Sequence, residues 1–360
     1  MMHMVPGYRV IEYGNYGSES EADEHVTILQ KDEYERFYPP QKPHEFEGNR
    51  ATIRSLGHTV FEAILKEELK KRLNLKDIIC HPFGKAHSSI VGIHGPGIQD
   101  VETGIGYPDG PIGAWRIFES ESWRHYHWGV HEKDPANNGP GGNRNYSWVI
   151  PNYFDLDDWP VTEKFIQTGA AYNNSYVLFL GRIDPCKGIL TLADIIKAYD
   201  SRHPEDALQF WFAGQGDIQG TKDRVGEALW AKRCRFLGPV IGKARGPLMG
   251  GALATMMPTN FIEPFGGSGV EGMLCGTPLI SVDYGAFTET NIQGVTGFRC
   301  KTLRHFVEAI ENAHTLDRSR IANMARAKYS LQTCAKQYDA AFRQLGELFG
   351  EGWYSLGPRG

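Results

Sequence analysis

The residues best suited to chemistry are two carboxylates in one glycine-rich segment. It reads EPFGGSGVE from Glu263 to Glu271. Glycines let a backbone approach a ligand closely, and a helix that begins at Gly267 or Ser268 would direct free N–H groups at an anion. Such a layout can hold a sugar by Glu263, a diphosphate by the helix start, and a ribose diol by Glu271. By spacing alone, helix capping and surface charge remain an alternative for both carboxylates.

Two basic residues lie in an upstream turn, GRIDPCKG, between a predicted strand and a predicted helix. Ligands of open α/β sheets bind beyond the carboxyl ends of the strands, so Arg182 and Lys187 can reach the crevice predicted for Glu263. Two cations facing a pyrophosphate would offset the charge that grows on it as a sugar departs. For either residue taken alone, a solvated loop charge remains the alternative.

Apolar runs and helical periodicity indicate the elements that must position these groups. In the C-terminal half, strands are predicted at 176–180, 208–213, 235–237, 253–257 and 278–282, with amphipathic helices among them. Buried strands separated by helices are typical of a parallel sheet covered on both faces. The N-terminal half has a similar character, with strands predicted at 8–12, 25–30 and 77–80 and a helix face at 60–69.

Chain length favours two domains, because 360 residues exceed what one core usually serves. The segment 149–159 contains Pro-Asn and several acidic residues, which suit a connector. We therefore predict an α/β protein with two Rossmann-like domains facing each other across a cleft. The predicted domains are 1–152 and 153–335, followed by a C-terminal helix and tail, 336–360, that could pack back on the first domain.

Composition argues against several classes of partner. The net charge of −5 is modest and both signs are mixed, so nothing calls for nucleic acid or an anionic membrane. The six cysteines form no C-x-x-C pair, and the chain begins without a signal-like segment, which predicts reduced thiols, no structural zinc and a cytoplasmic location. No apolar run is long enough for a transmembrane segment. Peripheral membrane contact and a homo-oligomer remain compatible with this composition.

An ordered set of segments, spread over roughly residues 149–300, resembles the donor-binding domain of family-four retaining glycosyltransferases of the GT-B fold. The matching segments are Gly181-Arg182 with Lys187-Gly188, Ala213–Gly216, Phe236–Val240, Met257–Thr259, Glu263–Glu271, Gly276–Pro278 and Gly297-Phe298. Each motif is weak alone, and their shared order makes the resemblance specific.

The resemblance implies a role for each matched residue. Arg182 and Lys187 would hold the diphosphate, Glu263 the donor sugar, and Glu271 the ribose. Further donor contacts would come from Gly181, Gly214, Gly238, Val240, Phe265, Gly266 and Gly267. The family needs no metal and no cofactor besides the nucleotide sugar, because the two cations supply the neutralising charge.

The implied function is retaining transfer of a hexose from a GDP- or UDP-linked donor, such as GDP-mannose or UDP-glucose, to a glycan, glycoprotein or lipid acceptor. A GT-B-fold sugar-nucleotide epimerase or hydrolase and a non-catalytic nucleotide-sugar-binding protein remain alternatives. An oxidoreductase is disfavoured: the glycine loop 214–220 imitates a dinucleotide fingerprint, but the next strand, 235–237, lacks the acidic residue that would hold the ribose.

The acceptor side matches the family only thinly. Gly14, His81 and Tyr107 are its candidate residues, since each follows a predicted strand or replaces a family position there. Asp155-Leu156-Asp157 fits the Asp-x-Asp string of metal-dependent glycosyltransferases, but it lies in the connector. We interpret it as a helix-start or turn feature and predict no metal site.

Overall fold

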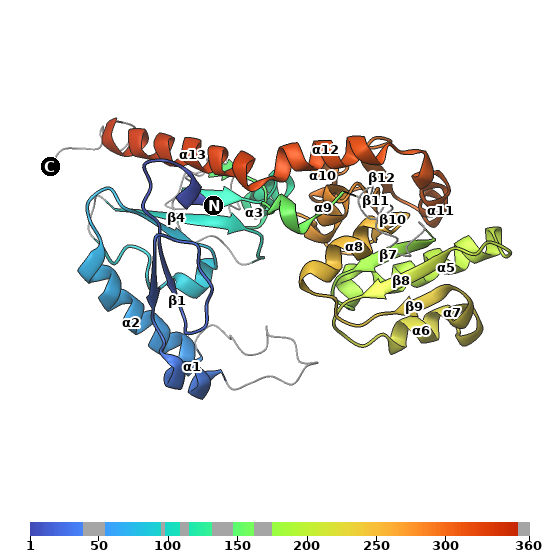
Figure 1. Ribbon diagram of the computed structural model, residues 1–360, viewed down its shortest axis with the longest axis horizontal. Helices are drawn as coiled ribbons and strands as arrows, with labels where there is room; N and C mark the ends of the chain where they lie inside the picture. Colours follow the sequence, from blue (N-terminus) through green and yellow to red (C-terminus); the bar gives the residue numbers. More distant parts are fainter. Residues whose placement is uncertain (39–54, 95–97, 109–114, 132–146, 162–174, 352–360) are drawn as a thin grey trace. The chain divides into compact units, whose positions relative to one another are not determined.

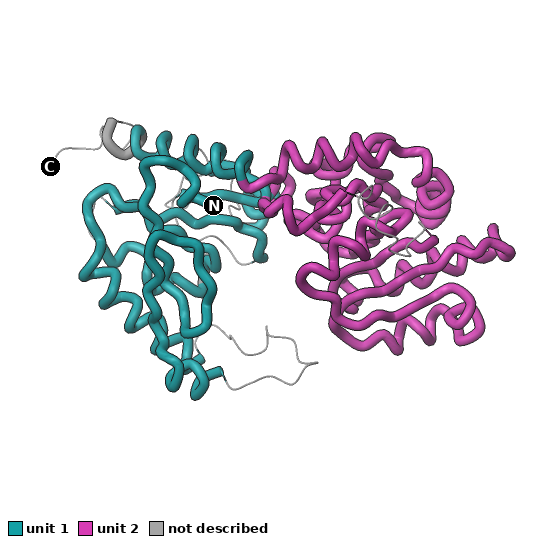
Figure 2. The backbone as a smooth tube through the Cα atoms, viewed as in Figure 1, with its two compact units in different colours: residues 1–119, 124–151, 332–360 teal, residues 120–123, 152–331 magenta. Residues whose placement is uncertain are grey.

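The computed structural model describes residues 1–38, 55–94, 98–108, 115–131, 147–161 and 175–351 (Figure 1). The chain divides into two compact units (Figure 2). Unit 1 comprises Met1–Glu119, Arg124–Pro151 and Gln332–Gly360, and unit 2 comprises Ser120–Trp123 and Asn152–Leu331.

Unit 2 is built on a six-stranded sheet in which every neighbouring pair is parallel. Its strands are β7 (Tyr176–Leu180), β8 (Gln209–Ala213), β9 (Cys234–Phe236), β10 (Ala254–Met257), β11 (Leu279–Val282) and β12 (Gly297–Cys300). The order across the sheet is β12-β11-β10-β7-β8-β9. Chain order therefore reverses between β7 and β10, and ligands of such sheets bind beyond the carboxyl ends of the strands at this reversal.

Helices cover both faces of this sheet. Consecutive strand residues point to opposite faces, and the first four residues of β7 are all buried, as is the whole of β10 and β11. The α-helices are α5 (Ile189–Arg202), α6 (Gln219–Val225), α7 (Glu227–Arg233), α8 (Arg245–Gly250), α9 (Gly267–Leu274), α10 (Phe287–Thr290), α11 (Leu303–Asn312) and α12 (Arg318–Tyr329). Short 3-10 turns are η5 (Leu156–Asp158), η6 (Pro185–Lys187), η7 (Gly242–Ala244) and η8 (Ala313–Thr315).

Unit 1 contains two smaller parallel sheets. One pairs β1 (Ile11–Gly14) with β2 (Glu24–Thr27), and the other has the order β3-β4-β5-β6, with β3 (Ile78–His81), β4 (Gln99–Ile105), β5 (Trp115–Phe118) and β6 (Ser147–Val149). Its helices are η1 (Met2–Met4), α1 (Lys31–Phe37), α2 (Leu56–Arg72), η3 (Gly84–His87), α3 (Glu121–His131), which begins within unit 2, and α13 (Leu331–Glu351).

The last helix, α13, contributes to the core of unit 1 from Gln332 onward. Its Tyr338, Phe342 and Leu345 belong to the same buried cluster as residues of β4 and β5. Among the helices of the described residues, none combines the length and the apolar composition that a bilayer span requires.

The sequence-based strand predictions left out β4, β5 and β6 of unit 1, and elsewhere they differ from the structure mainly at the ends and the edges. The first strand lies at 11–14 instead of 8–12, and β12, a four-residue edge strand, was not predicted. Only the first and last residues of β12 are buried, so it lacks the continuous apolar run that marks the central strands.

Two loops at the reversal of strand order are held together by direct contacts. Gly188 ends the loop after β7 in a left-handed conformation (φ +76°), and a Cβ built there would lie 1.7 Å from the carbonyl oxygen of Pro258, just after β10. The amide of Asn260 donates to the Cys186 carbonyl at 2.8 Å. The two strand ends that flank the crevice are thus in backbone contact.

This contact predicts that Gly188→Ala destabilises the protein by more than about 2 kcal/mol, because the left-handed backbone and the clash with Pro258 oppose any side chain. Gly220→Ala in α6 is a matched control: a Cβ there meets nothing within 4 Å, so its effect should stay within about 1 kcal/mol. Urea unfolding measures both free energies. Equal effects of the two substitutions would contradict the close approach at Gly188.

Candidate functional site

An ion pair between Lys187 and Glu263 lies at the reversal of strand order. Nζ of Lys187 is 3.0 Å from one carboxylate oxygen of Glu263 and 3.1 Å from the other. The side chains are only 17% and 9% exposed, and the ammonium lies 4.5 Å from the centre of the Phe261 ring. Both charges are largely withdrawn from water, so each depends on the other for compensation.

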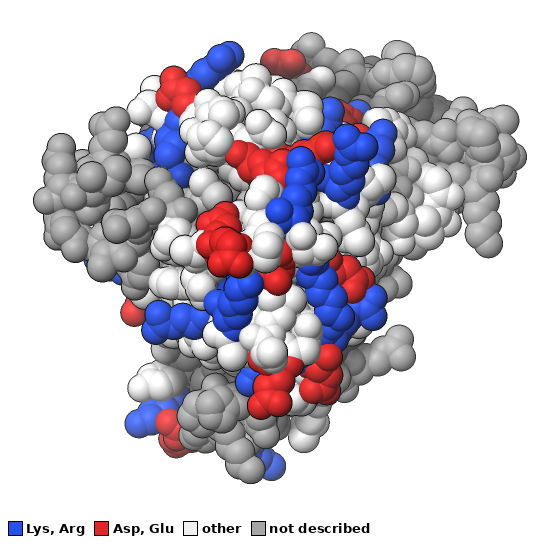
Figure 3. Space-filling view, turned by 90° about the vertical axis from the view of Figure 1, so that its right-hand side faces the viewer, with Lys and Arg blue, Asp and Glu red and all other residues white. Residues whose placement is uncertain are grey.

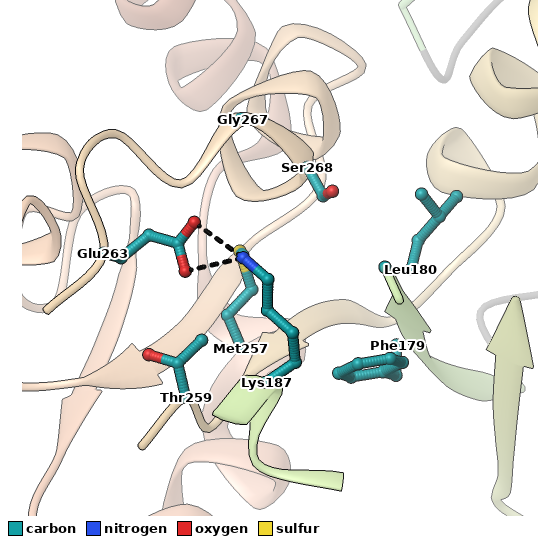
Figure 4. Close-up of a pocket in the computed structure, with 9 residues that line it drawn as sticks. Phe179, Leu180, Lys187, Met257, Thr259, Glu263, Gly267 and Ser268 are labelled. Atoms are coloured by element: carbon teal, nitrogen blue, oxygen red, sulfur yellow. Dashed lines mark hydrogen bonds and ion pairs between the residues drawn. The ribbon is translucent and has the colours of Figure 1, made fainter. Parts of the chain in front are cut away.

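The pair lines a small pocket, and Figure 4 shows the two side chains pointing toward one another beside Met257, with Gly267 and Ser268 of α9 nearby. Its walls come from the end of β7, the end of β10 and the start of α9. The lining residues are Phe179, Leu180, Gly181, Lys187, Met257, Thr259, Glu263, Gly267 and Ser268.

Helix α9 begins directly at this pocket. Gly266 is its N-cap in a left-handed conformation (φ +81°), and a Cβ there would lie 2.6 Å from the Phe287 ring, so glycine is required. The first N–H groups of a helix have no acceptor within the helix and carry partial positive charge. With Gly267 and Ser268 in the pocket wall, the helix start can bind an anion there.

Glu271 lies one turn further along α9 and pairs with Arg245, the first residue of α8. The Glu271 side chain is 11% exposed and that of Arg245 is 27% exposed. Burial raises the pKa of Glu271 to about 7, and the positive charge of Arg245 opposes this rise. Near neutral pH, this carboxyl is therefore poised between its two protonation states.

Glycines bring the ends of three adjacent strands together. The amide of Gly181 donates to the Ala213 carbonyl at 3.0 Å, and the amide of Gly214 donates to the Gly238 carbonyl at 2.9 Å. A Cβ on Gly214 would lie 1.7 Å from the Gly181 carbonyl oxygen. Packing alone thus explains Gly214, whereas its contact with a donor, like those of Gly181, Gly238 and the half-buried Val240, stays a prediction.

Of the remaining donor-side candidates, Arg182 is exposed and Phe265 is buried. Arg182 is exposed in the loop after β7 and is not among the residues that line the pocket. Phe265 is 3% exposed and stacks on Phe154, so its ring belongs to the core, and only its backbone is available to a ligand.

The turn after β7 carries its own negative charge. Hydrogen bonds from Cys186 and the nearby charges of Arg182 and Lys187 hold the pKa of Asp184 below its ordinary value. The Asp184 carboxylate also accepts the Cys186 amide at 2.8 Å and so caps η6. This cap orients the turn that presents Lys187 to the pocket.

The interpretation of Asp155-Leu156-Asp157 as a helix-start feature is confirmed. The Asp155 side chain accepts the amide of Asp157 at 3.0 Å and caps η5. Within the ranges that the structure describes, no group of three or more histidine, cysteine or acidic side chains is arranged to hold a metal ion.

Two acceptor-side candidates lie at the ends of neighbouring strands of unit 1: His81 is the last residue of β3, and Tyr107 follows β4. His81 is 3% exposed, and its Nε2 lies 2.6 Å from a carboxylate oxygen of Asp100. The Tyr107 hydroxyl donates to Glu102, whose Cα pairs with that of His81 in the β3–β4 register. Both side chains thus have structural partners at one end of the sheet, and their acceptor role stays a prediction.

Gly14, the third acceptor-side candidate, ends β1 in the separate two-stranded sheet. A Cβ there would lie 2.8 Å from the His25 ring and 3.1 Å from the Ser18 hydroxyl. A side chain at this position would require the His25 and Ser18 side chains to move.

The sequence did not single out Arg245 and Phe261, which contact the candidate residues Glu271 and Lys187. Arg245 pairs with Glu271 from a position 26 residues away, and Phe261 supports the ammonium of Lys187. Neither lies in a recognisable motif. Arg245 could have been suspected only from the general rule that buried carboxylates have a partner.

Comparison with known proteins gives a family match over part of the chain. Residues 174–315 match the sequence model described as "Glycosyl transferases group 1". A phosphatidyl-myo-inositol mannosyltransferase of Mycobacterium tuberculosis is 32% identical over 149 residues, which are 41% of this chain and 38% of that protein. A glycogen synthase of Mycobacterium tuberculosis is 27% identical over 284 residues, 72% of this chain and 66% of that protein.

The chain contains a glycosyl transferases group 1 segment at residues 174–315. It spans less than two thirds of the length of either relative. The solved structure of sucrose-phosphate synthase from Thermosynechococcus elongatus matches with a TM-score of 0.65 at 17% identity and covers 96% of this chain and 91% of its own. The predicted fold class, α/β with two Rossmann-like domains of the GT-B type, is thereby confirmed.

The buried ion pair predicts coupled effects of its two residues on stability. Lys187→Met should lower the free energy of unfolding by about 1–3 kcal/mol, because Glu263 keeps its buried charge without a partner. Glu263→Gln added to that variant should restore part of the loss. Lys232→Met, which breaks an exposed pair with Asp200 (44% and 22% exposed), should cost less than about 1 kcal/mol. Urea unfolding of Lys187→Met, Glu263→Gln, their double variant and Lys232→Met would refute the coupling if the two effects at the pair simply add.

Proposed function

We propose that the protein is a retaining, metal-independent hexosyltransferase. Its donor is a nucleoside diphosphate hexose, GDP-linked or UDP-linked as in GDP-mannose or UDP-glucose, and its acceptor is a hydroxyl of a glycan, glycoprotein or lipid. The observation that carries the proposal is the buried Lys187–Glu263 pair at the start of α9, at the reversal of strand order.

This arrangement offers binding groups to three parts of the donor: the diphosphate, the sugar and the ribose. The helix start offers N–H donors to a diphosphate, and Lys187 adds a cation that has further N–H donors besides those facing Glu263. The carboxylate of Glu263 can accept hydrogen bonds from sugar hydroxyls. Glu271, one turn further along the same helix, suits the ribose diol.

Transfer would proceed on one face of the sugar. The acceptor oxygen forms a bond to the anomeric carbon while the bond from that carbon to the β-phosphate oxygen breaks, and the acceptor proton passes to the departing phosphate. The nucleoside diphosphate leaves with the bonding electrons, so the anomeric configuration is retained. Lys187, Arg182 and the N–H groups of α9 would stabilise the charge that develops on the leaving group.

Glu263 has a separate part in this mechanism. It grips sugar hydroxyls, and its negative charge favours the positive charge that the ring acquires as the leaving group departs. Its ion pair with Lys187 at 3.0 Å supports this proposal, because the charges proposed to bind sugar and phosphate lie side by side.

The described surface agrees with a small-molecule donor. On the face drawn in Figure 3, basic and acidic side chains are interspersed, so that face presents no broad basic area of the kind that a nucleic acid backbone needs. We propose no nucleic acid partner. The mannosyltransferase relative makes GDP-mannose a donor worth testing beside UDP-glucose.

Donor binding should weaken when either cation is removed. For Arg182→Ala and Lys187→Ala we expect losses on the order of 1.5–3 kcal/mol in calorimetric titration with a panel of nucleotide sugars, since each removes a charged hydrogen bond to phosphate. Lys232→Ala, at an exposed ion pair, is the control and should bind like wild type. Wild-type affinity in a folded double variant of Arg182 and Lys187 would remove both from the site.

Product analysis tests the reaction itself. With an acceptor, NMR of the product should show the anomeric configuration of the donor, and activity should survive EDTA. Glu263→Gln should impair transfer without abolishing donor binding. An inverted product, or activity restored only by manganese or magnesium, would contradict the proposed class. Epimerised or hydrolysed donor at full rate without acceptor would favour an epimerase or hydrolase, and binding without turnover a non-catalytic protein.

A further inference from the structure

We infer that Arg245 is a positioning residue for donor binding: its guanidinium aims Glu271 and favours the ionised form of its carboxyl, which accepts hydrogen bonds from the ribose of a nucleoside diphosphate. This inference rests on the proposed function, because it adds a residue and a pH dependence to the same site. No sequence motif assigns Arg245 a role.

The geometry ties the two side chains together across two helices. Arg245 opens α8, directly after η7, and its Nη2 donates to a carboxylate oxygen of Glu271 in α9. The guanidinium carbon lies 5.7 Å from the centre of the Trp159 ring, which is 8% exposed. The Trp159 ring beneath the guanidinium and the Glu271 carboxylate at its end restrict the orientation of the Arg245 side chain.

The segment that carries Trp159 is itself held in place. Arg326 of α12 donates to the Trp159 carbonyl at 2.8 Å. Gly246, next to Arg245, packs so closely that a Cβ there would lie 3.0 Å from the Asp158 carbonyl oxygen. The start of α8 is therefore fixed against the segment that carries Trp159, and Arg245 is fixed with it.

Because Glu271 is buried, its ionisation depends on the charge of Arg245. Desolvation raises the pKa of Glu271 to about 7, and Arg245 is the charge that opposes it. Because an opposite charge within a few ångströms typically changes a carboxyl pKa by about 1–3 units, Glu271 without Arg245 would be protonated at neutral pH. A protonated carboxyl loses acceptor capacity for the ribose diol.

Other titratable or charged groups near Glu271 have different partners. Cys275, at the end of α9, has a raised pKa because of burial and the charge of Glu271. Arg318 of α12 donates to the carbonyls of Gly250 and Ala252, and Arg326 donates to that of Trp159. Arg245 of α8 is thus the cation that the structure places on Glu271 itself.

A ligand-free titration tests this assignment independently of the enzyme's activity. The side-chain carboxyl of Glu271 is followed by ¹³C NMR and assigned by its disappearance in Glu271→Gln. Wild type should titrate near the value of about 7 given by burial and Arg245 together. Arg245→Gln should raise the midpoint by at least about one pH unit, and Arg245→Lys, which retains the charge, should stay nearer to wild type.

Nucleotide binding supplies the second readout, with UDP and GDP as probes in calorimetry from acidic to alkaline pH. The R245Q variant should bind about tenfold more weakly at neutral pH and recover at alkaline pH, where Glu271 ionises despite its burial. In the E271Q background, R245Q should change the affinity no further. Arg224→Gln, which breaks an exposed pair with Asp194, is the matched control and should follow wild type.

The results of these experiments distinguish a failure of the role inferred for Arg245 from a failure of the proposed function. If wild type binds neither nucleotide, the proposed function fails, while the Glu271 titration still decides the role of Arg245. If wild type binds but R245Q leaves the midpoint and the pH dependence unchanged, or R245K shifts them as far as R245Q, the inference is overturned. Arg245→Ala replaces R245Q in both experiments if the glutamine variant does not fold.

Discussion

The buried pair of Lys187 and Glu263 is the interaction on which the organisation of unit 2 around the site depends. Each residue follows one of the two strands, β7 and β10, that flank the reversal of chain order. Neither charge would be stable alone at this depth, so the pair holds the two loops in one arrangement. A ligand that brings both a sugar and a diphosphate can offer hydroxyl donors to Glu263 and negative charge to Lys187.

Close backbone packing makes this arrangement possible. Gly188 against Pro258, Gly214 against Gly181, and Gly266 against the Phe287 ring all occupy positions where a Cβ would overlap a neighbour. All three have positive φ, which only glycine adopts without strain. Glycines that motifs associate with ligand binding therefore also serve the scaffold, and this double role explains why they lie at the ends of the strands around one pocket.

Much of unit 2 could be predicted because its signals are local. Apolar runs marked the central strands, and the segment from Glu263 to Glu271 indicated a helix start next to a carboxylate, which α9 now provides. The pairing of Lys187 with Glu263 could not be predicted, since residues far apart in the sequence meet only through the strand order. Arg245 was missed for the same reason: its partner Glu271 lies on another helix, and no pattern in the sequence links the two.

The most direct test of the account is a crystal structure of the protein with UDP or GDP bound, whichever binds more tightly in solution. We predict the diphosphate at the start of α9, in contact with Lys187, with the ribose hydroxyls donating to Glu271. A nucleotide bound elsewhere on unit 2, with the Lys187–Glu263 pair intact and the pocket beside Gly267 empty, would contradict it.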